Sequence, residues 1–211
     1  MLRSIRCYGI CRKWPGMIIP LVLLFVHCSG DTSDSTEYHE HSREIAFISE
    51  RIDMTVDPGL LTLTGHYTFR RSYSTPQRFA VSYPFPVNHD MSFPDSIDIC
   101  RVIDKQYIAV NKQHDYDNVS FIVPFDEADT VTVKVQYTQR LSSNIAQYIL
   151  TTTAAWGVPL EHAEFFVSVP DSLDHVALSY TPDLTKFENG RIIYCIKRTR
   201  FMPEKDLVVR W

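Results

Sequence analysis

The sequence contains few glycines and lacks the short motifs that mark common enzymes. Only 7 of its 211 residues are glycine, and none of them form a glycine-rich phosphate loop. HExxH and GxSxG do not occur, and the body of the chain has no CxxC. No cofactor and no metal site are therefore expected, and no catalytic residue is nominated.

Positive charge is scarce outside the N-terminus. Four of the 21 basic residues (Arg3, Arg6, Arg12 and Lys13) precede residue 31, which leaves 17 basic against 25 acidic residues in the rest of the chain. A surface with that excess of negative charge repels phosphate backbones. Nucleic acid is therefore not expected as a partner.

Long hydrophobic runs are also missing, and the one short run follows the basic residues. Residues 17–26 carry no charge, but as a helix they would extend only about 15 Å, against about 30 Å for the hydrocarbon core of a bilayer. A basic start followed by a short apolar run is typical of a secretory signal, which we predict over residues 1–28. Residues 29–43, rich in Ser, Thr, Asp and Glu, predict a disordered acidic linker.

Cys28 lies just after the hydrophobic run. The stretch LLFVHC resembles a bacterial lipoprotein signal, and the following SGDTSDSTE resembles the export tag of surface lipoproteins in Bacteroidetes-like bacteria. The resemblance implies that Cys28 is acylated and anchors the chain to the outer membrane of the cell envelope. Ordinary cleavage after Gly30 stays open as the alternative, because Cys28 and Gly30 are small; the product would then be secreted.

The linker also holds His39 and His41, on either side of Glu40. Imidazole binds zinc or copper, but two histidines in an unordered segment do not make a preorganised tetrahedral site. We interpret them as part of a polar spacer.

Residues 44–211 alternate with a period close to two and predict an all-β domain. The DPG triplet at residues 57–59 is strong turn chemistry and predicts a hairpin between its flanking strands. A dozen or so short strands with frequent turn signals predict an antiparallel β-sandwich, possibly two β subdomains with a boundary near residues 124–129. Residues 146–156 are expected to form one of the strands, because the β-branched run at 151–153 disfavours a helix.

The body of the chain contains two of the five cysteines, Cys100 and Cys195. In an exported protein they could form one disulfide. They could equally be small buried hydrophobic residues, because free cysteine packs well in protein interiors.

Two groups of side chains are candidate sites. Tyr83, Phe85 and Phe93 lie in a proline-punctuated stretch and are a possible binding surface for a protein or glycan partner. The second group is an acidic cluster that could serve a glycosidase or bind calcium, although charged turn residues between strands are usually only solvated. Its members are Asp115, Asp117, Asp126, Glu127 and Asp129.

Two stretches resemble a known type of domain. GHYTFRRSYSTPQRFAVSYPFP (65–86) and YILTTTAAWGVPLEHAEFFVSVP (148–170) are similar to uncharacterised secreted bacterial β-sandwich domains of the DUF4424-like sort. The resemblance supports the fold and implies no enzyme activity. We therefore expect a non-enzymatic, lipid-anchored interaction or structural module of the envelope. The alternative is a secreted hydrolase or carbohydrate-binding protein that uses the acidic or aromatic surface.

Overall fold

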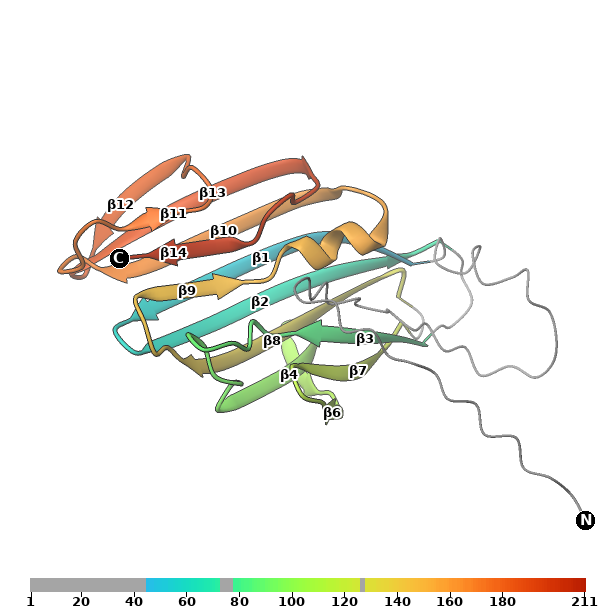
Figure 1. Ribbon diagram of the computed structural model, residues 1–211. Coiled ribbons are helices and arrows are strands. Elements are labelled where there is room, and N and C mark those ends of the chain that lie inside the picture. Colours follow the sequence, from blue (N-terminus) through green and yellow to red (C-terminus); the bar gives the residue numbers. More distant parts are fainter. Residues whose placement is uncertain (1–44, 73–77, 126–127) are drawn as a thin grey trace, which may run out of the picture.

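A computed structural model describes residues 45–72, 78–125 and 128–211. Within these residues nearly all regular structure is β, and the predicted antiparallel sandwich is confirmed (Figure 1). The signal, Cys28, the linker, His39 and His41 lie outside the described residues. No helix within these three ranges combines the length and the apolar character needed to cross a membrane.

One large sheet forms the back of the molecule (Figure 1). Its eight strands, in spatial order, are β12 (Leu184–Glu188), β13 (Arg191–Phe201), β10 (Leu160–Pro170), β1 (Ile45–Asp57), β2 (Leu60–Arg71), β8 (Thr130–Arg140), β4 (Ser96–Ile103) and β5 (Gln106–Ala109). All neighbours in it pair antiparallel except β1 and β10, which run parallel. The sheet takes strands from both sides of residues 124–129.

Two three-stranded sheets cover one face of the large sheet (Figure 1). One consists of β11 (Ala177–Leu178), β14 (Leu207–Arg210) and β9 (Ile145–Tyr148), and the other of β3 (Arg78–Pro84), β7 (Asn118–Pro124) and β6 (Lys112–His114). Alternate residues of the long strands point between the layers and form one continuous apolar core.

The hairpin predicted at residues 57–59 is confirmed. β1 and β2 pair from Asp57 opposite Leu60 to Ile45 opposite Arg71. Gly59 adopts φ +82°, which is readily accessible to glycine. The pairing is interrupted once, between Phe47 and Ser49, by a β-bulge. Because one residue is inserted there, the inward-facing positions change from Phe47 to the even-numbered series that starts at Glu50.

The strand predicted over residues 146–156 is wrong in its second half. β9 ends at Tyr148, and a 3-10 helix, η3, covers Thr151–Trp156. The carboxylate of Asp206 accepts hydrogen bonds from the backbone N–H groups of Leu150 and Thr151, each at 3.0 Å. This contact satisfies amides at the start of the helix that would otherwise lack partners.

Of the two possibilities for Cys100 and Cys195, the disulfide is not formed. Cys100 and Cys195 are both free, on β4 and β13. Five strand spacings separate β4 from β13 in the large sheet, or roughly 24 Å at about 4.8 Å each. Since a disulfide requires Cα atoms within about 7 Å, the strand order rules the bond out.

Candidate functional site

A cavity of about 60 Å³ lies between the large sheet and the elements that cover it. It is lined by Phe47, Glu50, Tyr67, Phe69, Val81, Ser82, Tyr83, Pro84, Phe121, Val133, Tyr148, Ile149, Thr152, Thr153 and Trp156. The residues from β1 and β2 are buried and make the floor, whereas Ser82, Pro84, Ile149 and Thr152 are half-buried and make the rim. The cavity has room for about four groups of the size of a water molecule.

Glu50 is the one acidic residue of this lining, and only 3% of its surface is exposed. The bulge near Ser49 places it on the inward face of β1, beside Tyr67 of β2. Its Oε2 accepts a hydrogen bond from the Tyr148 hydroxyl at 3.2 Å. Its Oε1 is buried and has no hydrogen-bond partner among the residues that the structure describes.

Burial also changes the acidity of Glu50. Removal from water disfavours the charged form and raises its pKa to about 8, although the hydrogen bond from Tyr148 acts in the opposite direction. At neutral pH the carboxyl group is therefore mostly protonated and uncharged.

Three tyrosine hydroxyls form a chain that ends on Glu50. The Tyr67 hydroxyl lies 3.0 Å from that of Tyr148 and 2.7 Å from that of Tyr83. Each phenol has one proton, and when Glu50 is ionised, Tyr148 donates its own to the carboxylate. Tyr148 must then accept from Tyr67, and Tyr67 must accept from Tyr83. All three O–H bonds consequently point along the chain toward the carboxyl group.

Gly65 gives the Tyr67 side chain the room it needs. The two residues are neighbours on the inward face of β2, and the Tyr67 ring and hydroxyl lie where a Cβ at position 65 would stand. Any other residue at position 65 would push the phenol out of the chain. This is the close approach that a glycine within a strand often marks.

Aromatic rings surround the far end of the cavity. The ring centroids of Phe47 and Phe69 are 5.1 Å apart, and that of Trp156 lies 5.9 and 5.5 Å from them. The wall therefore combines ring surfaces with the one carboxyl group, and none of the lining residues is Lys, Arg or His.

The surface predicted from Tyr83, Phe85 and Phe93 is not exposed. Tyr83 and Phe85 are 8% and 2% exposed, and Phe93 is half-buried against the core. Phe85 packs edge-on against Phe93 and Tyr137, with ring centroids 5.3 and 5.0 Å apart. The stretch with the prolines is not an exposed loop: Pro84 is the last residue of β3, and the alternate residues Phe79, Val81 and Tyr83 of this strand face the core. Tyr83 does reach the cavity, as part of the hydroxyl chain.

The predicted acidic cluster does not come together in the described part of the chain. Asp115 and Asp117 lie before β7, whereas Asp129 lies after it. Seven residues of strand separate the two ends by about 20 Å, more than the 5–10 Å that glycosidase carboxylates need. Asp129 pairs with Arg71 at 3.2 Å. Asp126 and Glu127 are outside the described residues.

Metal ligands are likewise not grouped in the described ranges. No set of three or more His, Cys, Asp or Glu side chains there is placed to hold an ion.

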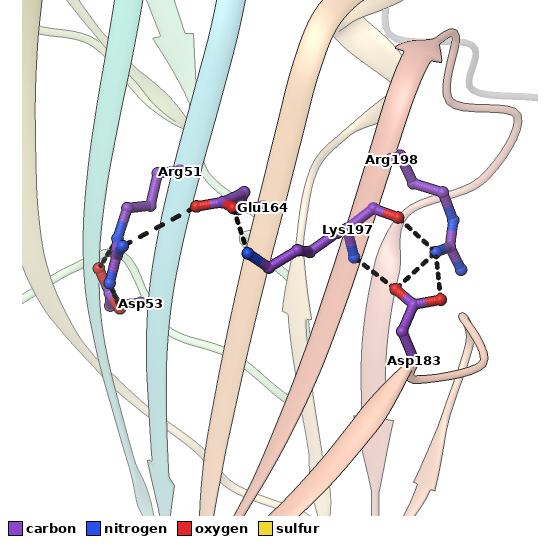
Figure 2. Close-up of polar contacts among 6 residues, drawn as sticks. All are labelled: Arg51, Asp53, Glu164, Asp183, Lys197 and Arg198. Atoms are coloured by element: carbon purple, nitrogen blue, oxygen red, sulfur yellow. Dashed lines mark hydrogen bonds and ion pairs between the residues drawn. The ribbon is translucent and has the colours of Figure 1, made fainter.

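A second polar group lies on the outer face of the large sheet (Figure 2). Arg51 contacts Asp53 at 3.1 Å and Glu164 at 3.9 Å, and Lys197 contacts Glu164 at 2.8 Å. The Arg51 guanidinium also lies 4.4 Å from the centre of the Phe166 ring. These side chains are exposed or half-buried, and their ion pairs connect β1, β10 and β13. Because the charged groups are paired with one another, this cluster is not a candidate ligand site.

Glu50 is not among the site residues predicted from the sequence. Its signal was an acidic residue in the same phase as Ile52, Met54 and Val56, all of which face the core. Phe47 is also buried but lies in the odd-numbered phase, so a regular strand through Phe47 would place Glu50 on the outer face. The bulge between Phe47 and Ser49 changes the phase, and its position cannot be predicted from one strand alone.

Comparison with known proteins supports the fold only. No family model matches the chain, and no curated protein does. Among solved structures, a protein from Legionella pneumophila described as a nutrient-binding protein is 14% identical, with a TM-score of 0.62; the match covers 80% of this chain and 67% of that one.

Weaker similarity extends to larger enzymes. An M1 zinc metallopeptidase from Deinococcus radiodurans is 11% identical with a TM-score of 0.47, and the match covers 80% of this chain and 42% of that one. Yeast LTA4 hydrolase is 8% identical with a TM-score of 0.48, and the match covers 79% of this chain and 29% of that one. The chain thus spans less than half of either enzyme. It shares a β-sandwich architecture with the Legionella protein.

Proposed function

We propose that this chain is a non-enzymatic binding module of the cell envelope, exported and anchored by a lipid on Cys28, which takes a small ligand into the cavity beside Glu50. The observation that carries the proposal is the buried carboxyl group of Glu50 in the cavity lining, whose Oε1 has no hydrogen-bond partner among the residues that the structure describes. A buried polar atom in that state is costly and is normally satisfied by a protein group, a water molecule or a ligand.

The chemistry of the tyrosines favours binding over catalysis. Burial raises the pKa values of Tyr67, Tyr83 and Tyr148 well above the ordinary phenol value. These phenols stay protonated at neutral pH and are poor bases and nucleophiles. They hold Glu50 in place, as the supporting groups of a rigid binding site do.

Two further observations support the envelope role. The basic and apolar start of the chain, followed by Cys28, has the order of a lipoprotein signal. The Legionella protein with this architecture is described as nutrient-binding, which agrees with a ligand site in an exported module.

The binding part is tested with a variant that fills the cavity. Thr152→Phe adds a ring at the rim, and Ala155→Phe adds the same ring to an exposed position of the same 3-10 helix. Small molecules extracted from the envelope of the source cells should raise the melting temperature of the wild type and of Ala155→Phe. They should not raise that of Thr152→Phe. An equal rise in all three proteins, or none in the wild type, contradicts the proposal.

The anchor is tested by intact mass of the protein from the membrane fraction. The expected species begins at Cys28 and carries acyl mass, and Cys28→Ala should move the protein out of that fraction. A mature chain that begins at Asp31 without added mass would show that it is secreted instead.

A further inference from the structure

The geometry points to a primary ammonium group as the ligand of the cavity, bound as R–NH₃⁺ to Oε1 of an ionised Glu50 and surrounded by aromatic rings. This inference rests on the proposed function and specifies the chemistry of its ligand.

The first reason is the vacant acceptor. Oε2 of Glu50 already accepts from Tyr148, whereas Oε1 accepts from no described residue. A carboxylate oxygen is an acceptor only, so the group that completes it must donate. An ammonium group donates three N–H bonds and can reach Oε1 and hydroxyl oxygens of the wall together.

The second reason is the direction of the hydroxyl chain. Once Glu50 is ionised, the protons of Tyr83, Tyr67 and Tyr148 all have to point toward Oε2. Such a chain stabilises negative charge on the carboxyl group, because hydrogen bonds donated to the charged form favour it. The complement of a stabilised carboxylate is a cation.

The third reason is that no described group near Glu50 supplies that positive charge. The neighbours of Glu50 across β1 are Tyr67 on β2 and Ala163 on β10. From the covering layers it faces Tyr83 and Tyr148. The titratable groups that face it are thus all tyrosines, and the positive charge has to arrive with the ligand.

The aromatic wall fits an organic cation better than a metal ion. The faces of aromatic rings carry negative charge density and attract ammonium groups, most strongly where water is excluded. Phe47, Phe69 and Trp156 supply such rings within the lining. One carboxylate is too few ligands for Ca²⁺ or Mg²⁺, which take six or more oxygens.

The volume limits the part of the ligand that enters. About 60 Å³ suits an ammonium group with one or two carbons. The rest of a longer molecule would extend out of the cavity past its half-buried rim, which is formed by Ser82, Pro84, Ile149 and Thr152.

Binding is coupled to one proton. In the empty site Glu50 is a carboxylic acid below its pKa of about 8. When R–NH₃⁺ enters, the O–H bond of Glu50 breaks, its proton passes to the solvent, and the carboxylate pairs with the ammonium group. No bond of the ligand changes. The apparent affinity should therefore fall about tenfold for each pH unit below 8, while a primary amine, with a pKa of about 10, stays charged.

The experiment is a titration of the full chain with ethylamine, followed by the indole N–H signal of Trp156 in ¹⁵N-edited NMR. Ethylamine should shift this signal in a saturable way at pH 8, with at least fivefold weaker binding at pH 7. Ethanol, its neutral analogue, and tetramethylammonium, which cannot donate to Oε1, should each bind at least tenfold more weakly.

Two variants and one control test the residues. Glu50→Gln keeps the shape of the side chain and should lose at least tenfold in affinity for ethylamine, and it should lose the pH dependence as well. Tyr148→Phe removes the donor to Oε2 and should weaken binding several-fold. Glu164→Gln alters a half-buried carboxylate on the outer face of the sheet, away from the cavity lining, and should bind ethylamine like the wild type.

Several results would overturn the assignment. They are no binding of ethylamine to the wild type, equal binding by Glu50→Gln, and binding of ethanol or tetramethylammonium as tight as that of ethylamine. The proposed function is judged separately: if envelope extract still stabilises the wild type but not Thr152→Phe, the cavity binds a ligand that is not an amine.

Discussion

At the scale of single residues, the unusual feature is an acidic side chain at a core position. Glu50 occupies a place in β1 where Ile52, Met54 and Val56 would suggest another apolar residue. The free-energy cost of burying its carboxyl group is partly offset by one hydrogen bond from Tyr148, whose hydroxyl also contacts that of Tyr67. Stability and binding at this position both depend on whether the carboxyl group carries charge.

The charge of Glu50 should make stability depend on pH. Its pKa is raised from 4.5 to about 8 in the folded state, so the folded chain holds a proton that the unfolded chain releases. Between these pH values the free energy of unfolding should fall as pH rises, by up to about 5 kcal/mol from this group, and it should level off above pH 8. Glu50→Gln should lack this fall, as measured by urea denaturation at pH 5 and pH 8.

The matched control for this prediction is Glu164→Gln, which alters a half-buried carboxylate on the outer face of the large sheet and should keep the wild-type pH dependence. If Glu50→Gln and the wild type lose the same stability between pH 5 and pH 8, Glu50 is not protonated in the folded protein.

Gly65 gives a second prediction at this scale. Gly65→Ala places a methyl group where the Tyr67 ring and hydroxyl stand. Overpacking of this kind costs about 1–3 kcal/mol, and displacement of the phenol should break the hydroxyl chain as well. Thr64→Ala, the adjacent residue on the outer face, should change the free energy of unfolding by less than about 0.5 kcal/mol. Equal effects of the two variants in chemical denaturation would refute the close contact.

At the scale of elements, the parallel pair of β1 and β10 departs from the antiparallel pattern of the sheet. The ends of these strands are joined by Arg191, the first residue of β13. It donates to the Val56 carbonyl at 2.9 Å and the Ser168 carbonyl at 3.1 Å, and to Asp57 at 2.8 Å. One guanidinium group thereby fixes the ends of three neighbouring strands.

Arg191→Lys should destabilise the fold although charge is kept. A lysine ammonium cannot reproduce the planar set of donors, so carbonyl and carboxylate partners lose their hydrogen bonds at a cost of about 2 kcal/mol. Arg70→Lys is the control, because Arg70 makes an exposed pair with Glu161 worth at most about 1 kcal/mol. Urea denaturation at neutral pH compares the two. If Arg191→Lys lowers the free energy of unfolding by no more than Arg70→Lys does, the hydrogen bonds of the Arg191 guanidinium do not stabilise the fold.

At the scale of the whole molecule, the core between the layers stabilises the described residues, and no disulfide links the two cysteines among them. The largest fully buried side chains are supplied by both the large sheet and the segments that cover it, among them Tyr137, Phe165, Phe79 and Leu150. The two free thiols lie on strands near opposite edges of the large sheet.

Cys100 and Cys195 should therefore both be reduced in the folded protein. Alkylation of the unfolded, unreduced protein followed by peptide mass analysis should find both cysteines modified. Recovery of a peptide pair linked through Cys100 and Cys195 would mean that the strand order of the large sheet is wrong.

The sequence by itself determined the all-β class and the hairpin at residues 57–59, because side-chain alternation and turn chemistry are local properties of the chain. Only the tertiary structure decided the rest. Asp206 ends β9 and starts the 3-10 helix from 55 residues away, the strand order separates Cys100 from Cys195, and the bulge turns Glu50 inward toward three tyrosines from three different strands. None of these is visible along one strand, since each depends on which distant residues the sheets bring together.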